Sequence, residues 1–130
     1  MQGEVIPPRD LKQPVKAINY DAYEGMLIGE CREGGSAVEV KGQSGWIVFK
    51  DAEFGEGVSR MQLRAASTTS ASVEIRLQSP AGPVAGRVEL VGSGAQEWSD
   101  YIIELNGVSG RQDVYIIVNG SASLSSVQFL

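Results

Sequence analysis

Glycine-rich turns interrupt the sequence repeatedly after residue 15, and this pattern restricts the fold more than any other feature. Turn signals recur roughly every 8 to 12 residues, and between them the sequence carries short apolar or alternating runs, a pattern typical of an all-β sandwich or barrel. The one helical turn that the pattern allows, over residues 20–25, is too short to affect the fold class. The chain is therefore predicted to be all-β.

The alternation of apolar and polar residues places the individual strands. Residues 59–65 and 72–78 alternate strictly, so each segment is predicted to turn one face to a core and the other to water. Their polar side chains include Gln62, Arg64, Glu74 and Arg76. Four segments are more continuously apolar or β-branched and are predicted to be interior strands, at residues 45–49, 87–91, 101–105 and 114–118. Residues 127–130 are predicted to close the sheet.

The composition limits the class of protein and of partner. With 42% hydrophobic and 21% charged residues and no long apolar run, the 130 residues predict one soluble globular domain. The 11 basic and 16 acidic side chains give a net charge of −5, the wrong sign for neutralising the phosphates of nucleic acid or anionic lipid. We therefore expect neither nucleic acid nor a membrane as a partner.

Two residue types that carry much of protein chemistry are absent or nearly so. The chain has no histidine, so it lacks the usual general base near neutral pH and the commonest metal ligand, and Cys31 is its single cysteine. These counts exclude Ser-His and Cys-His catalysis and a thiolate zinc site. Hydrolysis by a pair of carboxylates stays open, although it needs a deep cleft that a chain this short seldom builds.

The N-terminal residues differ in composition from the rest. Residues 1–14 contain Pro7, Pro8 and Pro14 among charged residues and have no sustained periodicity, which is typical of an extended linker or the cut end of an expressed fragment. The folded domain is predicted to span residues 15–130. The first residues have neither the basic start nor the apolar middle of a signal peptide.

A series of segments occurs in a fixed order along the domain. Residues 15–20, 33–38 and 45–49 resemble a strand of the type I-E-A-E followed by G-G-x-N-V-G-Y-I-x-x-G-D-W, with no gap between Gly34 and Trp46. Further matching stretches, which look like R-V-A-S, I-E-L-R-L, Q-T-W and G-V-x-G-x-H-D-L-Y, lie at residues 63–67, 73–77, 96–98 and 107–115. In order and spacing the chain resembles a family 6 carbohydrate-binding module, of the kind appended to family 43 glycoside hydrolases.

This resemblance implies a jelly-roll β-sandwich of two antiparallel sheets, galactose-binding-like in architecture. It further implies a non-catalytic, monomeric and extracellular module that holds a secreted glycoside hydrolase, in the same parent chain, on a plant polysaccharide. The polysaccharide expected from the resemblance is xylan, arabinoxylan or a β-glucan.

The chain departs from the family at two of its sites. In the family site among the end loops, a Tyr and a Trp enclose a sugar ring, and here Val40 and Ala95 take their positions. The family calcium site uses acidic residues where this chain has Lys16, Ile18 and Ser125. Calcium needs several hard oxygen ligands at once. We therefore expect a weakened end-loop site and no calcium or other cofactor.

The remaining family site lies on the concave face of one sheet, where its usual platform is present as Trp46. Alternation places Gln62, Arg64, Glu74, Arg76 and Tyr115 on the same outer face, and Tyr20 is a candidate at its border. A flat indole beside charged hydrogen-bonding groups suits a sugar chain. In the alternative interpretation Trp46 mainly packs and the charged residues form an ordinary cross-strand ladder.

A second functional class remains open. A degenerate module would keep the sandwich, lose its sugar sites, and pack on a catalytic domain to stabilise it. The substitutions at Val40 and Ala95 favour this alternative.

Overall fold

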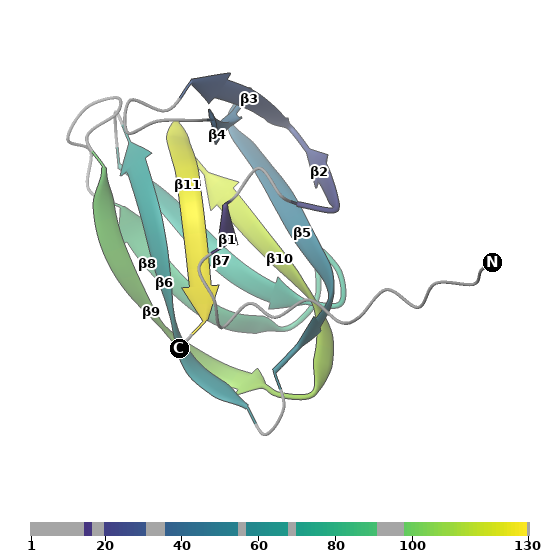
Figure 1. Cartoon of the computed structure of the whole chain (residues 1–130). Coiled ribbons are helices and arrows are strands. Elements are labelled where there is room, and N and C mark those ends of the chain that lie inside the picture. The colour runs from purple at the N-terminus through teal and green to yellow at the C-terminus, as the bar shows by residue number, and fades with distance from the viewer. Residues whose placement is uncertain are drawn as a thin grey trace.

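The computed structural model describes residues 15–16, 20–30, 36–54, 57–67, 70–90 and 98–129. These residues form two antiparallel sheets that face each other (Figure 1). All their regular structure is strand, which confirms the predicted all-β sandwich. The described segments accordingly include no helix with the length and hydropathy needed to span a membrane.

Each sheet takes its strands from both halves of the chain. The strands of the six-stranded sheet are β1 (Val15–Lys16), β3 (Met26–Glu30), β4 (Ser36–Val40), β6 (Val58–Ser67), β9 (Ser99–Val108) and β11 (Ala122–Phe129). The strands of the five-stranded sheet are β2 (Ala22–Glu24), β5 (Ser44–Glu53), β7 (Ala71–Leu77), β8 (Val84–Leu90) and β10 (Arg111–Asn119). Their orders are β3-β4-β11-β6-β9, with β1 also paired to β11, and β2-β5-β10-β7-β8.

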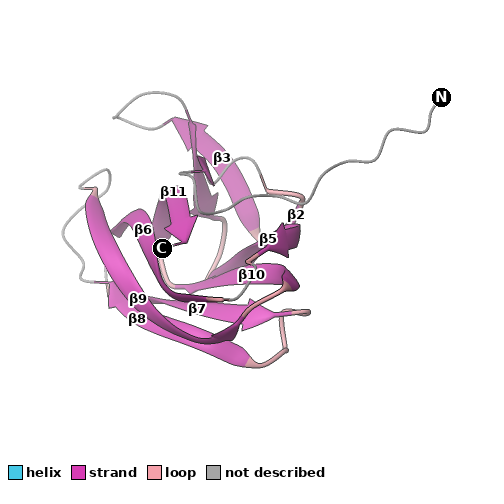
Figure 2. Ribbon diagram, turned by 60° about the horizontal axis from the view of Figure 1, so that its bottom comes forward, coloured by secondary structure: helices cyan, strands magenta, loops and turns pink. Residues whose placement is uncertain are grey.

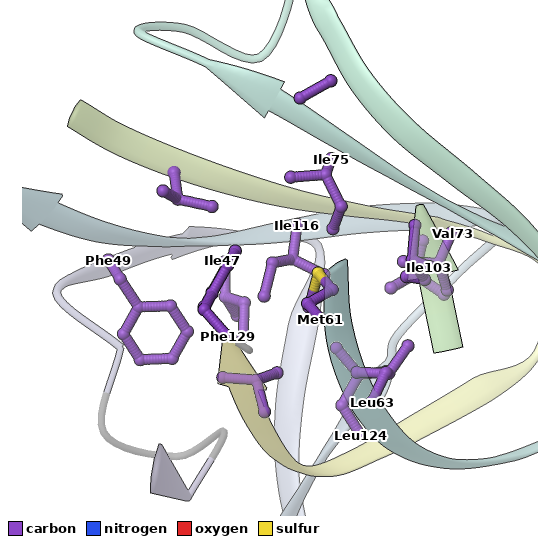
Figure 3. Packing of buried hydrophobic residues seen from close by; sticks show 14 of the residues in the cluster. Ile47, Phe49, Met61, Leu63, Val73, Ile75, Ile103, Ile116, Leu124 and Phe129 are labelled. Atoms are coloured by element: carbon purple, nitrogen blue, oxygen red, sulfur yellow. The ribbon is translucent and has the colours of Figure 1, made fainter. Parts of the chain in front are cut away.

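The core lies between the sheets and consists of the inward-facing residues of each strand. In β7, for example, Val73 and Ile75 are fully buried, whereas Glu74 and Arg76 on the other face are half-buried. Removing these apolar side chains from water is the main favourable contribution to folding. Figure 3 shows side chains of the two sheets meeting in this layer, among them Ile47, Phe49, Ile75, Ile116, Met61, Leu63, Leu124 and Phe129.

The alternation in the sequence located the core strands correctly. Residues 59–65 lie in β6 and residues 72–78 overlap β7, each with its apolar side chains in the core. The segments at residues 45–49 and 114–118 belong to β5 and β10, which are interior strands of the five-stranded sheet, as predicted.

Two other segments predicted as interior strands are edge strands, so that part of the prediction is wrong. Residues 87–90 lie in β8 and residues 101–105 in β9, at the ends of their sheets. The two edges lie side by side (Figure 2). A Cβ on Gly86 would come within 2.6 Å of the Glu104 backbone oxygen. The apolar residues of these edge strands are therefore covered by the opposite sheet. A sequence pattern shows that a strand is buried, but it does not show whether the strand has a neighbour on both sides in its own sheet.

Two local predictions are also corrected. Residues 20–25 form no helical turn; they contain β2, and Gly25 after it has a φ of +70°. The last strand begins at Ala122 rather than Val127 and does not close a sheet, because β11 lies between β4 and β6. Alternating serines at the start of β11 hid this strand, since serine is common in loops.

Candidate functional site

The structure divides the predicted site residues between two faces of the sandwich. Strand β6 pairs with β9 and β11, so Gln62 and Arg64 lie on the outer face of the six-stranded sheet. Strand β7 pairs with β10 and β8, so Glu74 lies on the outer face of the five-stranded sheet, as Trp46 of β5 does. The prediction of one common face is therefore wrong for Gln62 and Arg64. Alternation shows which side chains point away from the core, but it does not show which sheet a strand joins.

A row of residues crosses the five-stranded sheet at Trp46. In register, Glu24 of β2 is opposite Trp46, Trp46 is opposite Ile117 of β10, and Ile117 is opposite Glu74 of β7. The next row on this side joins Val48, Tyr115 and Arg76. We call the outer surface formed by Glu24, Trp46, Glu74, Arg76, Tyr115 and Ile117 the Trp46 face.

Two contacts hold the Trp46 side chain. Its Nε1 donates a hydrogen bond to Glu24 Oε2 at 3.2 Å. Its ring meets the Tyr115 ring edge to face, with centroids 5.1 Å apart and an interplanar angle of 66°. Trp46 is half-buried, so part of the indole is exposed to solvent in a fixed orientation.

A buried apolar residue, Val48, lies next to the two aromatic residues in the strand register. Val48 points to the same side as Trp46 but is fully buried. Its neighbours on that side are Ala22 and Tyr115 in register, and Trp46 two residues earlier. The residues around Val48 therefore shield it from solvent on this outer side of the sheet.

Charged groups complete the Trp46 face on the side of β7. Arg76 Nη2 is 3.4 Å from Glu74 Oε2, with side chains 26% and 19% exposed respectively. Arg76 Nη1 also donates a hydrogen bond to the Gly82 backbone oxygen at 2.8 Å. Adjacent strands are about 4.8 Å apart, so Glu74 lies roughly 10 Å across the sheet from Trp46. A ligand lying across the row would meet an aromatic surface at one end and a fixed guanidinium and carboxylate at the other.

Tyr20 does not join the Trp46 face. It packs against the hydrophobic core, and its ring centroid is 5.2 Å from that of Tyr23. Tyr23 is a residue of β2 and is in register with Ile47, which points into the core, so the two tyrosines lie at the β2 edge of the five-stranded sheet.

Glu24 and Ile117 were not among the predicted site residues. Glu24 was placed in a helical turn, and recognition of residues 22–24 as a short alternating strand ahead of Gly25 would have brought it next to Trp46. Ile117 is apolar and half-buried on an outer face, and nothing in its own segment separates it from the core residues on either side.

The structure describes some of the residues at the family's end-loop site and calcium site. Val40 is half-buried and packs against the core, whereas Ala95 lies outside the described residues. At the calcium positions, Lys16 is in register with Ser126 and Ser125 lies at a break in strand pairing, while Ile18 is not described. An ammonium and a hydroxyl do not supply the carboxylate ligands that calcium prefers. We therefore still expect the calcium site to be lost.

Comparison with known proteins places this geometry in a family. The sequence model described as carbohydrate binding module (family 6) matches residues 16–129. Among curated proteins, an endo-1,4-beta-xylanase A of Thermoclostridium stercorarium is 24% identical over 119 residues, which is 89% of this chain and 23% of that protein. The chain therefore spans less than a quarter of that relative.

Solved structures agree with this assignment. A family 6 carbohydrate-binding module of Clostridium cellulolyticum, in complex with xylose, has a TM-score of 0.87 and 30% identity, covering 94% of this chain and 99% of that one. A family 43 arabinoxylan arabinofuranohydrolase of Bacillus subtilis, in complex with cellotetraose, has a TM-score of 0.89 and 24% identity, covering 95% of this chain and 28% of that one. This chain belongs to the family 6 carbohydrate-binding modules.

Proposed function

We propose that this module binds a β-linked plant polysaccharide through the Trp46 face, with xylan, arabinoxylan and β-glucan as the candidate ligands. The observation that carries the proposal is the partly exposed indole of Trp46, held by Glu24 and Tyr115. Sugar rings present C–H groups that pack on a flat aromatic face, and their hydroxyls exchange hydrogen bonds with charged groups such as Arg76 and Glu74. Because these side chains are already held in place, binding orders little of the protein.

The similar proteins favour this class of ligand. The solved relatives were crystallised with xylose and with cellotetraose. The curated relatives include a xylanase and an arabinoxylan arabinofuranohydrolase, both much longer than this chain. The module would then act without catalysis, as the part of a secreted, extracellular glycoside hydrolase that keeps the enzyme on its substrate.

The test is calorimetric titration of the wild-type protein and of Trp46→Ala with xylotetraose and cellotetraose, together with affinity gels containing arabinoxylan and β-glucan. Stacking on an aromatic side chain contributes about 1 to 3 kcal/mol in nucleic-acid complexes, so by analogy Trp46→Ala should weaken binding roughly 5- to 150-fold. Tyr23→Ala is the matched control, because Tyr23 is 54% exposed but lies away from the Trp46 face. Equal binding by wild type and Trp46→Ala, or no binding to any of these saccharides, would count against the proposal.

A second candidate function is the stabilisation of an attached catalytic domain. The observation that favours it is the exposure of three apolar side chains on β2 and β3, which follow one another in the chain: Tyr23, Leu27 and Ile28 are 54%, 50% and 57% exposed. A purely packing role predicts that deleting the module lowers the melting temperature of the parent enzyme and leaves its binding to insoluble substrate unchanged. The sugar-binding role predicts loss of that binding.

A further inference from the structure

A pocket lies on the outer face of the six-stranded sheet, on the opposite side of the sandwich from Trp46. It has a volume of about 240 Å³ and is lined by Gln62, Arg64, Asp100, Ser126, Val127 and Gln128, which we call the β6 pocket. We propose that the β6 pocket is a second saccharide subsite, which takes one neutral sugar ring by its hydroxyl groups. The proposal takes its ligand class from the proposed function, but it uses none of the residues of the Trp46 face.

Strand register explains why these side chains converge. Ser126 of β11 is opposite Arg64 of β6, and Arg64 is opposite Asp100 of β9. In the neighbouring outward-facing row Gln128 is opposite Gln62. The pairing of β11 with β6 shifts between Leu124 and Ser126, and such a bulge bends a strand and redirects its side chains. Four of the five polar residues thus lie in two adjacent rows of two neighbouring strands.

The donors and acceptors of the pocket match a pair of adjacent hydroxyls. Arg64 Nη1 lies 3.0 Å from Asp100 Oδ1, with side chains 31% and 48% exposed, so a planar donor and a carboxylate acceptor are side by side and reachable from solvent. A sugar hydroxyl both donates and accepts, and two neighbouring hydroxyls can use such a pair together.

The amide of Gln62 adds a group with unused hydrogen-bonding capacity. Gln62 is half-buried in the pocket wall, and within the described part of the chain its side chain has no hydrogen-bond partner. An amide supplies two donor hydrogens and an acceptor oxygen. Gln62 is therefore available to a ligand without breaking an existing contact.

The lining residues also limit what the pocket can hold. The charges of Arg64 and Asp100 cancel, so the pocket has no net charge among its lining side chains to favour an anion. None of those side chains is aromatic, so recognition depends on hydroxyls rather than on stacking. Pockets for drug-sized ligands span about 300–1,000 Å³, so this smaller pocket suits a single sugar ring or the end of a chain.

The position of the pocket has a consequence for the whole module. The two sheets of a sandwich are about 10 Å apart, and their outer faces point in opposite directions. A single saccharide strand lying on the Trp46 face does not reach the β6 pocket. Two occupied sites would therefore let one module contact two polysaccharide chains.

Nuclear magnetic resonance titration of the ¹⁵N-labelled protein with xylotetraose, and separately with cellotetraose, tests the proposal. The backbone amides of β6, β9 and β11 report on the pocket, and the Trp46 indole N–H reports on the Trp46 face. Arg64→Ala removes the guanidinium, and its matched control is Arg60→Ala, an exposed arginine on the same face of β6 in register with Glu104. Gln62→Ala is a second variant, which breaks no hydrogen bond to the described residues and so should fold normally.

We expect saturable shifts at the β6 pocket in the wild type and in Trp46→Ala. Arg64→Ala should weaken that response by about tenfold or more, as expected for loss of a hydrogen bond to a charged group, and Arg60→Ala should not. Shifts at the Trp46 indole alone would overturn the second subsite and leave the proposed function intact. Shifts at the pocket alone would support the second subsite and contradict the Trp46 face as the main site. Shifts at neither place would overturn both.

Discussion

The orientation of the Trp46 ring depends on its two neighbours, Glu24 and Tyr115. The hydrogen bond to Glu24 fixes one edge of the indole and the edge-to-face contact with Tyr115 fixes its tilt. An aromatic pair of this geometry contributes about 0.5 to 1.5 kcal/mol beyond its buried area. In the proposed function Glu24 is thus a positioning residue, acting on the ligand through Trp46.

Replacement of Glu24 tests this role. Glu24→Ala should weaken saccharide binding about 2- to 10-fold, the equivalent of one hydrogen bond, without preventing it. Glu24→Gln keeps a side-chain oxygen as acceptor and should recover most of the affinity. Titration calorimetry measures both, with Glu89→Ala as the control, since Glu89 is 70% exposed and paired to Arg87 rather than to Trp46. Equal affinities for wild type and Glu24→Ala would contradict the positioning role.

The close approach of strand β2 to strand β5 brings Glu24 next to Trp46. Gly25 has a φ of +70° and ends β2, and Gly45 immediately precedes Trp46. A Cβ on Gly45 would lie 2.6 Å from the Gly25 oxygen and 2.8 Å from the Glu24 oxygen. The absence of a side chain at Gly45 is therefore what lets the two strands pair at this point.

Gly45→Ala should force β2 away from β5. We expect a lower melting temperature and, because Glu24 moves with β2, weaker binding of saccharide. Gly42→Ala is the matched control, since a Cβ there meets nothing within 4 Å. Thermal unfolding followed by circular dichroism, with calorimetric titration of the same samples, checks both effects. A Gly45→Ala protein as stable as Gly42→Ala would show that β2 tolerates the side chain.

Two consecutive residues of strand β10 point to opposite sides of the sheet, one into the core and one to the Trp46 face. Ile116 points into the core and is fully buried, whereas Ile117 is half-buried on the Trp46 face. Truncating a buried isoleucine to alanine costs about 2 to 5 kcal/mol, because it removes transfer free energy and leaves a cavity. Truncating each residue in turn therefore tests which face of β10 contributes more to the free energy of unfolding.

Ile116→Ala should lower the free energy of unfolding by about 2 to 5 kcal/mol, and Ile117→Ala by less than half as much. Urea denaturation gives both values, provided that the dependence on denaturant concentration is unchanged between the proteins. A larger effect from Ile117→Ala would mean that the Trp46 face contributes more packing than the core side of β10.

At the scale of the whole molecule, burial between the sheets stabilises the sandwich, and we expect no contribution from calcium. A ligand present at 100 times its dissociation constant adds about 2.7 kcal/mol to stability, which would raise the melting temperature by several degrees. Because Lys16 and Ser125 replace acidic ligands, neither calcium nor a chelator should shift the melting temperature. Scanning calorimetry in each condition measures this, and a calcium-dependent rise would show that other oxygen ligands form the site.

The fold was predictable from local patterns, and so were four of the six residues of the Trp46 face: Trp46, Glu74, Arg76 and Tyr115. Alternation in β6 and β7 identified which side chains face out, and the segment from Gly34 to Trp46 carried the family resemblance. The same alternation assigned Arg64 and Arg76 to one face, although they lie on opposite sides of the sandwich. Side chains alternate with a period of two residues in every strand. This alternation shows which side of its strand a residue lies on, but it does not show to which sheet the strand belongs.

The sequence alone was enough to identify an all-β module that has no histidine and a single cysteine, with an indole at position 46 on the outward side of its strand. The three-dimensional arrangement was needed to show that Glu24 and Tyr115 hold that indole and that Gln62 and Arg64 belong to a separate pocket. The difference comes from how far apart in the sequence the interacting residues lie. Alternation and turn residues act between near neighbours in the chain, whereas partners such as Glu24 and Trp46, 22 residues apart, meet only through strand pairing.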